Sequence, residues 1–343
     1  MHILSVSYNL TLGGLEKVFF DYCNHFTQSG FRSSALTLKS AAINQALSET
    51  ETATFHNGWI EKKYCEYNPF AVSSIRSLLE KVNPDVILTH NARPLQLLKK
   101  AANSKWPVAV VHHGGSVKRL DSACHTICVS KYMVADVIAK GFSPSKVHHV
   151  PNAIDCSLSQ SRANLSNCNH ILTVGFLGRL TKEKGADLLI DAIQYVSRPI
   201  KLLIAGDGPE RAELETRSTG EEIEFLGWID NDQKKQFLAN CDVLVIPSRS
   251  ESFGLSILEA WQSGVPVIAT QTAGAPELIT HLKDGVLVAL NHPQALAGAI
   301  DNFSLEDSDK FAQRGWEKLL ENYSFPIQAE RLIQTVNQII QQP

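Results

Sequence analysis

The sequence lacks an apolar run of the about 18 residues that a membrane-spanning helix needs. It has no Cys-x-x-Cys pair, and its seven cysteines are an odd number. Most cysteines lie in apolar runs such as Ile127-Cys128-Val129, which indicates reduced, buried thiols and no disulfide framework. The N-terminal MHILSVSYN has neither the basic region nor the cleavage site of a signal peptide. We therefore expect a cytoplasmic protein.

One cysteine cluster has two interpretations. Cys124, His125 and Cys128 are close enough in sequence to be considered as metal ligands. Cys124 directly precedes the strand-like segment HTICVS and the other two lie in it, where the spacing of the two cysteines places both on one face. Core packing explains that arrangement better than a metal site does.

The charges are few and unevenly distributed. Charged residues make up 20% of the 343, and the net charge is −3. Residues 1–150 contain 16 Lys and Arg against 10 Asp and Glu, whereas the remainder contains 16 against 25. Basic residues of the first half lie beside aromatic ones or next to each other, at Lys62-Lys63-Tyr64, Lys99-Lys100, Lys105-Trp106 and Lys118-Arg119. This pattern suggests a peripheral contact with an anionic membrane or a phosphorylated acceptor, with an ordinary solvated surface as the alternative. No nucleic-acid-binding motif accompanies it.

Hydrophobic periodicity predicts two α/β halves, each with its own core. In the first half we expect strands at 3–8, 32–39, 86–90, 106–111 and 125–130, and helices at 15–28, 70–82 and 131–140. The region from 40 to about 68 reads as irregular, and 157–169 as a polar linker. In the second half we expect strands at 171–177, 200–205, 223–228, 241–247 and 265–270, and helices within 293–323 and at 326–341.

The most informative stretch is PSRSESFGLSILEAWQSGVPVIATQTAGAPE, residues 247–277. It contains Glu251 and Glu259, with seven residues between them. Gly254 interrupts the pattern, so a helix that begins there would place Glu259 in its second turn and leave Glu251 in the preceding loop. Both acids would then lie where strands of a parallel sheet end, which is the usual ligand crevice. A carboxylate there can accept hydrogen bonds from the hydroxyl groups of a sugar.

Three further stretches suggest phosphate binding. Gly13-Gly14 lies between a strand and a helix, where backbone amides can approach a phosphate closely. Arg179 and Lys184 straddle a strand end and a helix start, so the two cations can bind both phosphates of a diphosphate. The Gly206-Asp207-Gly208-Pro209 turn is a weaker signal of the same kind.

Histidines end two strands of the first half. His90-Asn91 follows PDVILT, and His112-His113 precedes Gly114-Gly115. A side chain at the carboxyl end of a strand is well placed for catalysis, although a lone histidine there is often structural. A metal site at the histidine pair is the rival interpretation, but neighbouring side chains of a strand point to opposite faces, which favours His113 alone as functional.

The pattern PSxxESFGxxxLEAxxxGxPVIA around Glu251 and Glu259 resembles the E-x7-E signature of the family 4 retaining glycosyltransferases of GT-B fold. The resemblance implies two Rossmann-like doubly wound parallel-sheet domains that face each other across a cleft. The N-terminal acceptor domain would comprise 1–155 and a returning helix at 326–343, and the nucleotide-sugar domain would comprise 156–325. The segment PNAID, with Ala153 where glycine is usual, resembles the family's interdomain segment.

The resemblance also implies roles for individual residues. The catalytic residues would be His90, Arg179, Lys184 and Glu251. The donor would contact Gly13, Gly14, Arg179, Lys184, Gly206, Leu226, Glu251, Ser252, Phe253, Gly254, Leu255 and Glu259. The acceptor side would include Asn91 and His113.

The resemblance thus implies a retaining glycosyltransferase, which we expect to be metal-independent and to need no cofactor. It would move a sugar from a nucleotide-diphosphate donor, UDP being the commonest in the family, to a hydroxyl acceptor that is lipid-linked or phosphorylated. Lipopolysaccharide, glycolipid or other envelope glycan assembly is the expected setting. The alternatives are a nucleotide-sugar 2-epimerase, a sugar phosphorylase, and a transferase-like protein that binds a partner without catalysis. The sugar, the linkage and the oligomeric state stay open.

Overall fold

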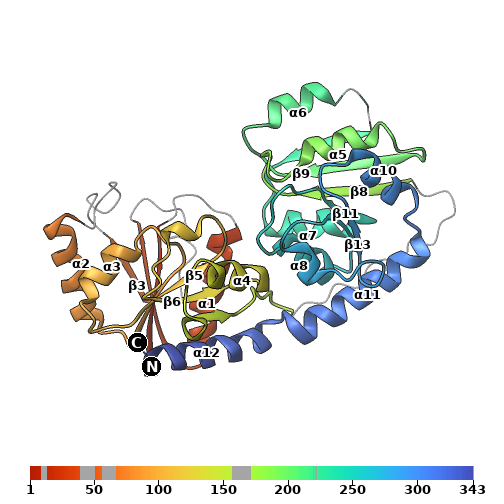
Figure 1. Ribbon diagram of the computed structural model, residues 1–343. Coiled ribbons are helices and arrows are strands. Elements are labelled where there is room, and N and C mark those ends of the chain that lie inside the picture. The colour runs from red at the N-terminus through yellow and green to blue at the C-terminus, as the bar shows by residue number, and fades with distance from the viewer. Residues whose placement is uncertain are drawn as a thin grey trace. The chain divides into compact units, whose positions relative to one another are not determined.

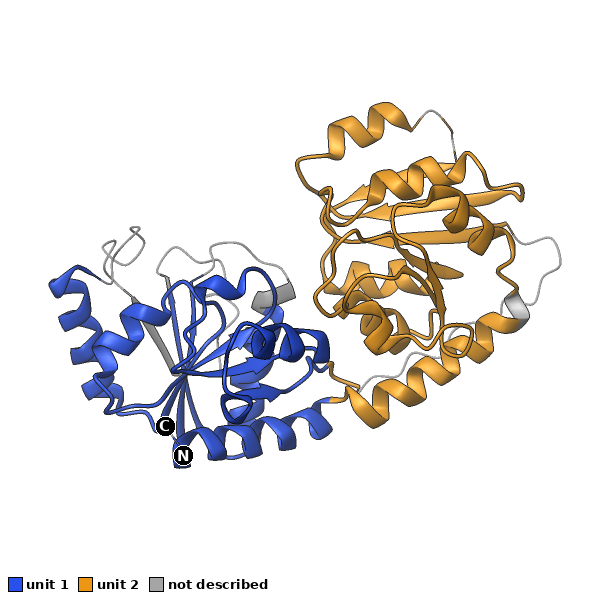
Figure 2. Cartoon of the chain, viewed as in Figure 1, with its two compact units in different colours: residues 1–153, 325–343 blue, residues 154–324 orange. Residues whose placement is uncertain are grey.

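The computed structural model describes residues 1–8, 14–38, 51–55, 67–156, 171–218, 220 and 222–342 (Figure 1). The chain divides into two compact units (Figure 2). Unit 1 comprises Met1–Ala153 and Phe325–Pro343, and unit 2 comprises Ile154–Ser324. Each unit differs from the domain expected at that place by no more than two residues at a boundary. The C-terminal segment thus returns to the first unit.

Unit 1 is built on a parallel sheet. Its described strands are β1 (His2–Ser7), β2 (Arg32–Leu38), β3 (Glu51–Phe55), β4 (Val86–Thr89), β5 (Val108–His112), β6 (His125–Cys128) and β7 (Val147–His149). They pair in the order β3-β2-β1-β4-β5-β6-β7. The order reverses between β1 and β4, so the strand-end loops diverge there and leave room for a ligand.

Helices complete unit 1. They are α1 (Gly14–Gln28), α2 (Pro69–Val82), α3 (Leu95–Ala102), α4 (Lys131–Ala139) and α12 (Phe325–Gln341), with single 3-10 turns at Val117–Arg119 and Pro144–Lys146. The last helix, α12, packs against α1 and β4. Its buried side chains recur at helical spacing, from Gln328 through Leu332 and Val336 to Ile339. This amphipathic stripe explains why the C-terminal segment belongs to unit 1.

Unit 2 repeats the architecture. Its strands are β8 (Leu172–Leu177), β9 (Ile200–Ala205), β10 (Ile223–Gly227), β11 (Val243–Ile246), β12 (Val267–Thr270) and β13 (Val286–Val288). They pair in parallel in the order β10-β9-β8-β11-β12-β13, which reverses between β8 and β11. The helices are α5 (Ala186–Ile193), α6 (Arg211–Arg217), α7 (Asn231–Ala239), α8 (Leu255–Gln262), α9 (Ala275–Leu278), α10 (Pro293–Asp301) and α11 (Leu305–Asn322). The predicted doubly wound α/β fold is confirmed.

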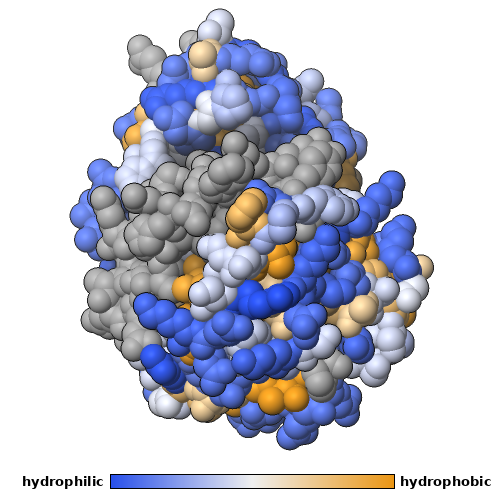
Figure 3. Space-filling model, turned by 90° about the vertical axis from the view of Figure 1, so that its left-hand side faces the viewer, coloured by the Kyte–Doolittle hydropathy of each residue, from blue (hydrophilic) through white to orange (hydrophobic). Residues whose placement is uncertain are grey.

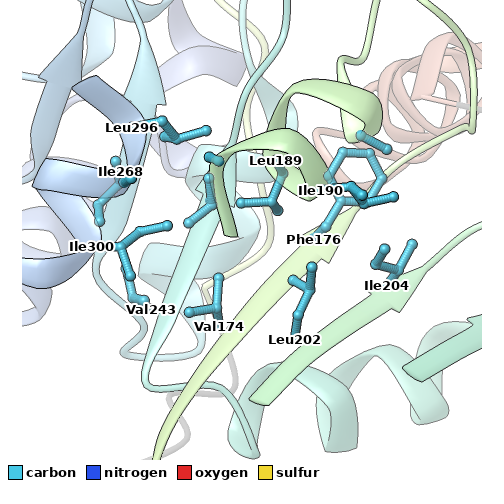
Figure 4. Packing of buried hydrophobic residues seen from close by; sticks show 14 of the residues in the cluster. Val174, Phe176, Leu189, Ile190, Leu202, Ile204, Val243, Ile268, Leu296 and Ile300 are labelled. Atoms are coloured by element: carbon cyan, nitrogen blue, oxygen red, sulfur yellow. The ribbon is translucent and has the colours of Figure 1, made fainter. Parts of the chain in front are cut away.

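Burial on both faces makes the central strands of unit 2 almost continuously apolar. In Figure 1, α5 and α10 lie on one side of the sheet, whereas α7 and α8 lie on the other. Figure 4 shows the layer beneath α5, where Val174 and Phe176 of β8 meet Leu189 of α5 and Ile300 of α10. All four side chains are buried. Strands covered on both faces lose the alternation of apolar and polar residues, which is why the sequence shows them as plain apolar runs.

Capping residues fix several helix starts. The Asn68 side chain accepts a hydrogen bond from Phe70 N at 3.0 Å, and Pro69 occupies the first turn of α2. A capping box joins Asp230 and Gln233 at the start of α7. The Ser304 side chain accepts a hydrogen bond from Asp307 N and caps α11, which follows α10 within the region 293–323 where helices were expected.

One expectation about unit 1 is wrong. The region from 40 to about 68 was expected to be irregular, but Glu51–Phe55 forms β3 and pairs with β2. The sequence ETATF has few large apolar residues, since β3 is an edge strand with a neighbour on only one side among the described residues. The linker expected at 157–169 lies outside the described residues.

The two cysteines at and just before β6 belong to the core. Cys124 and Cys128 are buried thiols, and burial raises the pKa of Cys128 to about 12. The His125 ring lies between His148, with 2.8 Å from Nδ1 to Nε2, and the Gln342 carbonyl oxygen, 2.6 Å from Nε2. A carbonyl only accepts, so His125 Nε2 carries the proton and His148 Nε2 donates to Nδ1. These contacts account for His125 without a metal ion.

Among the helices of the described residues, none is long and apolar enough to cross a bilayer.

Candidate active site

A short contact between opposite charges lies in unit 2 at a reversal of the strand order, where the carboxyl ends of β8 and β11 meet. Lys184 Nζ donates to Glu251 Oε2 at 2.6 Å. The lysine comes from the loop between β8 and α5, and the glutamate from the loop between β11 and α8. Their side chains are 28% and 14% exposed, so the pair is shielded but still reachable from solvent. A cation and an anion that were both predicted to bind the donor are thus neighbours.

Glycine allows the two loops to approach this closely. Gly185 adopts a left-handed φ of 72°, and a Cβ atom on it would lie 2.2 Å from the carbonyl oxygen of Pro247. A side chain at position 185 would therefore push the β11 loop away from the β8 loop. The loop around Glu251 is also held by the segment between β12 and α9, because Gly274 N donates to the Glu251 carbonyl oxygen at 3.1 Å.

Arg179, the second predicted cation, lies two residues beyond the end of β8 and is exposed. The pKa of the Glu183 carboxyl is lowered, first by a hydrogen bond from the Glu183 backbone and then by one from the Thr181 side chain. The charges of Arg179 and Lys184 lower this pKa further. Both cations therefore act on the same short loop.

Gly206 supports the same strand-end region. Its φ is 142°, and a Cβ atom would lie only 1.8 Å from the carbonyl oxygen of Gly178. The loops that follow β8 and β9 therefore touch through their backbones. Gly206 N also donates to the carbonyl oxygen of Gly227 at the end of β10. Gly206 is thus required for loop packing, whatever its contact with a donor.

The helix after Glu251 begins as predicted. Gly254 is the left-handed N-cap residue, with φ 107°, and α8 starts at Leu255, so Glu259 lies in its second turn. Ser252 lies in the loop before the helix, while the buried Phe253 ring packs edge-on against Tyr323.

Glu259 forms an ion pair that sequence reasoning missed. Lys234 Nζ of α7 lies 2.7 Å from Glu259 Oε1 of α8, and both side chains are mostly buried. Leu226 of β10, 37% exposed, lines a groove of about 340 Å³ together with Gln233 and Phe237 of α7. Side chains of α7 therefore lie beside both Glu259 and Leu226.

The histidines of unit 1 form a layered pair. His90 Nδ1 lies 3.3 Å from His113 Nε2, and the two rings are nearly parallel. Tyr22 and Phe19 contact His90 edge-on, and His90 has no exposed surface. Burial lowers the pKa of both histidines, that of His113 to about 3. Only His113 is partly exposed, so a direct contact of His90 with a ligand would require movement.

The remaining predicted residues lie nearby or outside the described part. Asn91 follows His90, and its carbonyl oxygen accepts a hydrogen bond from Thr89 Oγ1 at 2.7 Å. Gly14 is the first residue of α1, a position suited to an anion, whereas Gly13 lies outside the described residues. His112 is the last residue of β5 and is buried.

Two family models match the two halves of the chain. Residues 12–158 match glycosyltransferase family 4, and residues 171–305 match the glycosyl transferases of group 1. A component of the phosphatidylinositol N-acetylglucosaminyltransferase of Arabidopsis thaliana is 31% identical over 299 residues, which cover 77% of this chain and 66% of that protein. The chain belongs to glycosyltransferase family 4.

Two further comparisons extend this result. The lipopolysaccharide core biosynthesis glycosyltransferase LpsE of Rhizobium meliloti is 26% identical over 260 residues, covering 73% of this chain and 75% of that one. The Anabaena protein HepE, solved with UDP and glucose, has the same fold, with a TM-score of 0.84 at 21% identity over 98% of this chain and 99% of that one. Two other curated relatives are matched over only 50% and 57% of their length.

Sequence reasoning missed three charged residues of this family 4 member. Lys234 contacts Glu259, and Arg249 and Asp187 bind each other beside the Lys184 loop. Arg249 lies inside the recognised motif, but partners that are 25 to 62 residues apart leave no local pattern.

We predict that acid destabilises unit 1. Burial lowers the pKa of His90, His112, His113, His125 and His148, the last to about 4. These histidines take up protons on unfolding below the ordinary value of about 6.5, so stability is complete above that pH and falls as the pH decreases, by at most about 1.4 kcal/mol per pH unit for each. Urea unfolding between pH 7.5 and 5 measures this slope.

The variant His148→Asn removes one titrating group and should flatten that slope. A urea midpoint that does not change between pH 7.5 and 5 would contradict the prediction.

Proposed function

We propose that this protein is a retaining glycosyltransferase that moves a sugar from a nucleotide-diphosphate donor to a hydroxyl acceptor. The observation that carries the proposal is the contact between Lys184 and Glu251 where β8 and β11 end. A cation for the leaving diphosphate and a carboxylate for the sugar hydroxyls are needed side by side, because the reacting bond joins those two parts of the donor.

The leaving diphosphate sets the largest energetic demand. Negative charge develops on it as the bond to the sugar breaks, and fixed donors at that position stabilise the transition state. Arg179 and Lys184 supply charge-assisted hydrogen bonds in this proposal. The Lys184 ammonium, which contacts Glu251 in the free protein, is shared with the phosphates when the donor binds.

The sugar and the ribose are assigned to the two acids. Glu251 and the amides of Phe253 and Gly254 hold the sugar hydroxyls, while Glu259, oriented by Lys234, holds the ribose diol. The acceptor oxygen attacks the face that the diphosphate leaves, and its proton passes to a phosphate oxygen of the donor. His113 and Asn91 serve the acceptor side, and the buried His90 orients the His113 ring.

Within this proposal the nucleotide is UDP and the acceptor a glycolipid. HepE was solved with UDP and glucose, and the two curated relatives are named for phosphatidylinositol and for lipopolysaccharide core. A 2-epimerase of the same architecture differs in one respect, since it changes the donor without an acceptor. Incubation of the UDP-sugar alone therefore separates the two activities.

We predict that Lys184→Ala and Arg179→Ala each lower the rate of sugar transfer from a UDP-sugar by about 10²-fold, as loss of one charge-stabilising donor does. Lys310→Ala, which removes an exposed ammonium that pairs with Asp307 on α11, should keep the wild-type rate. Proton NMR of the product should show the anomeric configuration of the donor. A rate near wild type for Lys184→Ala would reject its role.

Metal-independent turnover is a separate prediction. Many glycosyltransferases bind a divalent ion through Asp-x-Asp, and Asp230-Asn231-Asp232 has that spacing. Asp230 is occupied as a helix cap, however, because it accepts from the backbone of Asp232 and Gln233 at 3.0 and 2.8 Å. The rate should be the same with EDTA as with manganese. Loss of activity in EDTA and its recovery with manganese would contradict the proposal.

We also propose that unit 1 makes a peripheral contact with anionic lipid. Tyr67 and Phe70 at the start of α2 are 72% and 80% exposed, and Lys100 Nζ lies 4.3 Å above the Tyr67 ring. Lys105 Nζ lies 4.3 Å from the ring centroid of Trp106, but that ring is buried in the core of unit 1. Figure 3 shows the side of the molecule on which α2 and α3 lie in Figure 1, a mainly hydrophilic face with separate hydrophobic spots. Cations beside exposed aromatic rings suit a lipid headgroup layer. Lys62, Lys63 and Tyr64 lie outside the described residues.

Lys100→Glu should weaken sedimentation with phosphatidylserine vesicles by about fivefold or more, since one surface lysine contributes about 1 kcal/mol. Lys140→Glu, an exposed lysine at the end of α4, serves as the charge-matched control. Equal binding of both variants, or no binding of the wild type, would remove the membrane proposal.

A further inference from the structure

The loop that carries Glu251 is fastened along the loop that carries Lys184. Arg249 N donates to the Glu183 carbonyl oxygen at 2.8 Å, and Ser250 N approaches the same oxygen at 3.4 Å. The backbone immediately before Glu251 thus lies against the backbone immediately before Lys184. Neither contact involves a group that the proposed reaction uses.

The Arg249 side chain joins the same two loops a second time. Its Nη1 donates to Asp187 Oδ1 at 2.7 Å and its Nη2 to Asp187 Oδ2 at 3.0 Å, a two-pronged contact that fixes the plane of both groups. Nη1 also donates to the Lys182 carbonyl oxygen at 2.9 Å. Arg249 therefore holds the β8 loop at Lys182, Glu183 and the first turn of α5.

Burial makes this contact different from the surface ion pairs around it. The Asp187 side chain is 8% exposed, and burial alone would raise its pKa. The hydrogen bond and charge of Arg249 reverse that effect and lower the pKa of Asp187. Lys182, which also reaches Glu210 and Glu213, is half-exposed, so its contacts are weak. A buried carboxylate that lost its arginine would be left without its main stabilising charge.

Position along the chain links this contact to the site. Lys184 lies two residues after Lys182 and three before Asp187, and Glu251 lies two residues after Arg249. Both Lys184 and Glu251 therefore lie within three residues of the Arg249–Asp187 contact along the chain. We propose that Arg249 and Asp187 are positioning residues that set where Lys184 meets the donor diphosphate, an inference that rests on the proposed donor site. The planar fork of arginine is needed for this, and lysine cannot replace it.

Chemical labelling of Lys184 tests, without any ligand, whether the contact between Arg249 and Asp187 holds Lys184 against Glu251. In the wild type Glu251 shields the Lys184 amine, so acetic anhydride should modify it slowly relative to the exposed Lys140, as measured by mass spectrometry. Arg249→Lys and Asp187→Asn should each accelerate modification of Lys184 by about fivefold, the size of one lost hydrogen bond, toward the rate in Glu251→Gln. Arg217→Lys, which alters the ion pair between Arg217 and Asp191 of the same helix α5, should have no effect. An unchanged Lys184 rate in a folded Arg249→Lys variant would overturn the proposal.

Calorimetric titration with UDP separates positioning from a general structural role. Arg249→Lys should weaken UDP by about tenfold and UMP little, since only the diphosphate spans the cations. In a Lys184→Ala background the same substitution should have no further effect on UDP. Equal weakening with and without Lys184 would overturn the positioning role. Unchanged UDP affinity in Lys184→Ala alone would instead reject the proposed donor site. The labelling result would still show whether Arg249 and Asp187 position Lys184.

Discussion

The contact between the Lys184 ammonium and the Glu251 carboxylate is the interaction on which the account of this protein depends. It exists because two central strands of a parallel sheet, β8 and β11, end side by side at the point where the strand order reverses. Loops that leave such strands diverge to opposite faces of the sheet, and their first residues are left at the opening. Gly185 lets the loops touch, and Arg249 with Asp187 fastens them.

Much of the fold follows from the sequence because its signals are local. Apolar runs in the sequence correspond to the central strands, since a parallel sheet buried on both faces selects such runs. The motif around Gly254 predicted the helix start correctly, because only a left-handed cap fits that turn. The return of the C-terminal segment to unit 1 was expected from the family resemblance alone, and the buried stripe of α12 gives its physical reason. The predictions failed at β3, where ETATF has too few apolar residues to form a strand pattern.

The site was only partly predictable. Arg179, Lys184, Glu251 and Glu259 stand out because each has a characteristic spacing from a strand end. Lys234 and Asp187 do not, since their partners are distant in sequence and ordinary surface charges look the same until the chain is folded. The burial of His90 beneath His113 was equally hidden, because a histidine at a strand end gives no sign of which rings will cover it.

A crystal structure of the protein with UDP bound tests the central claim most directly. The account predicts that oxygens of the diphosphate lie within about 3 Å of Lys184 Nζ and of the Arg179 guanidinium, beside the Glu251 carboxylate. A diphosphate that contacts neither cation, with the Lys184–Glu251 contact unchanged and remote from the nucleotide, would contradict it.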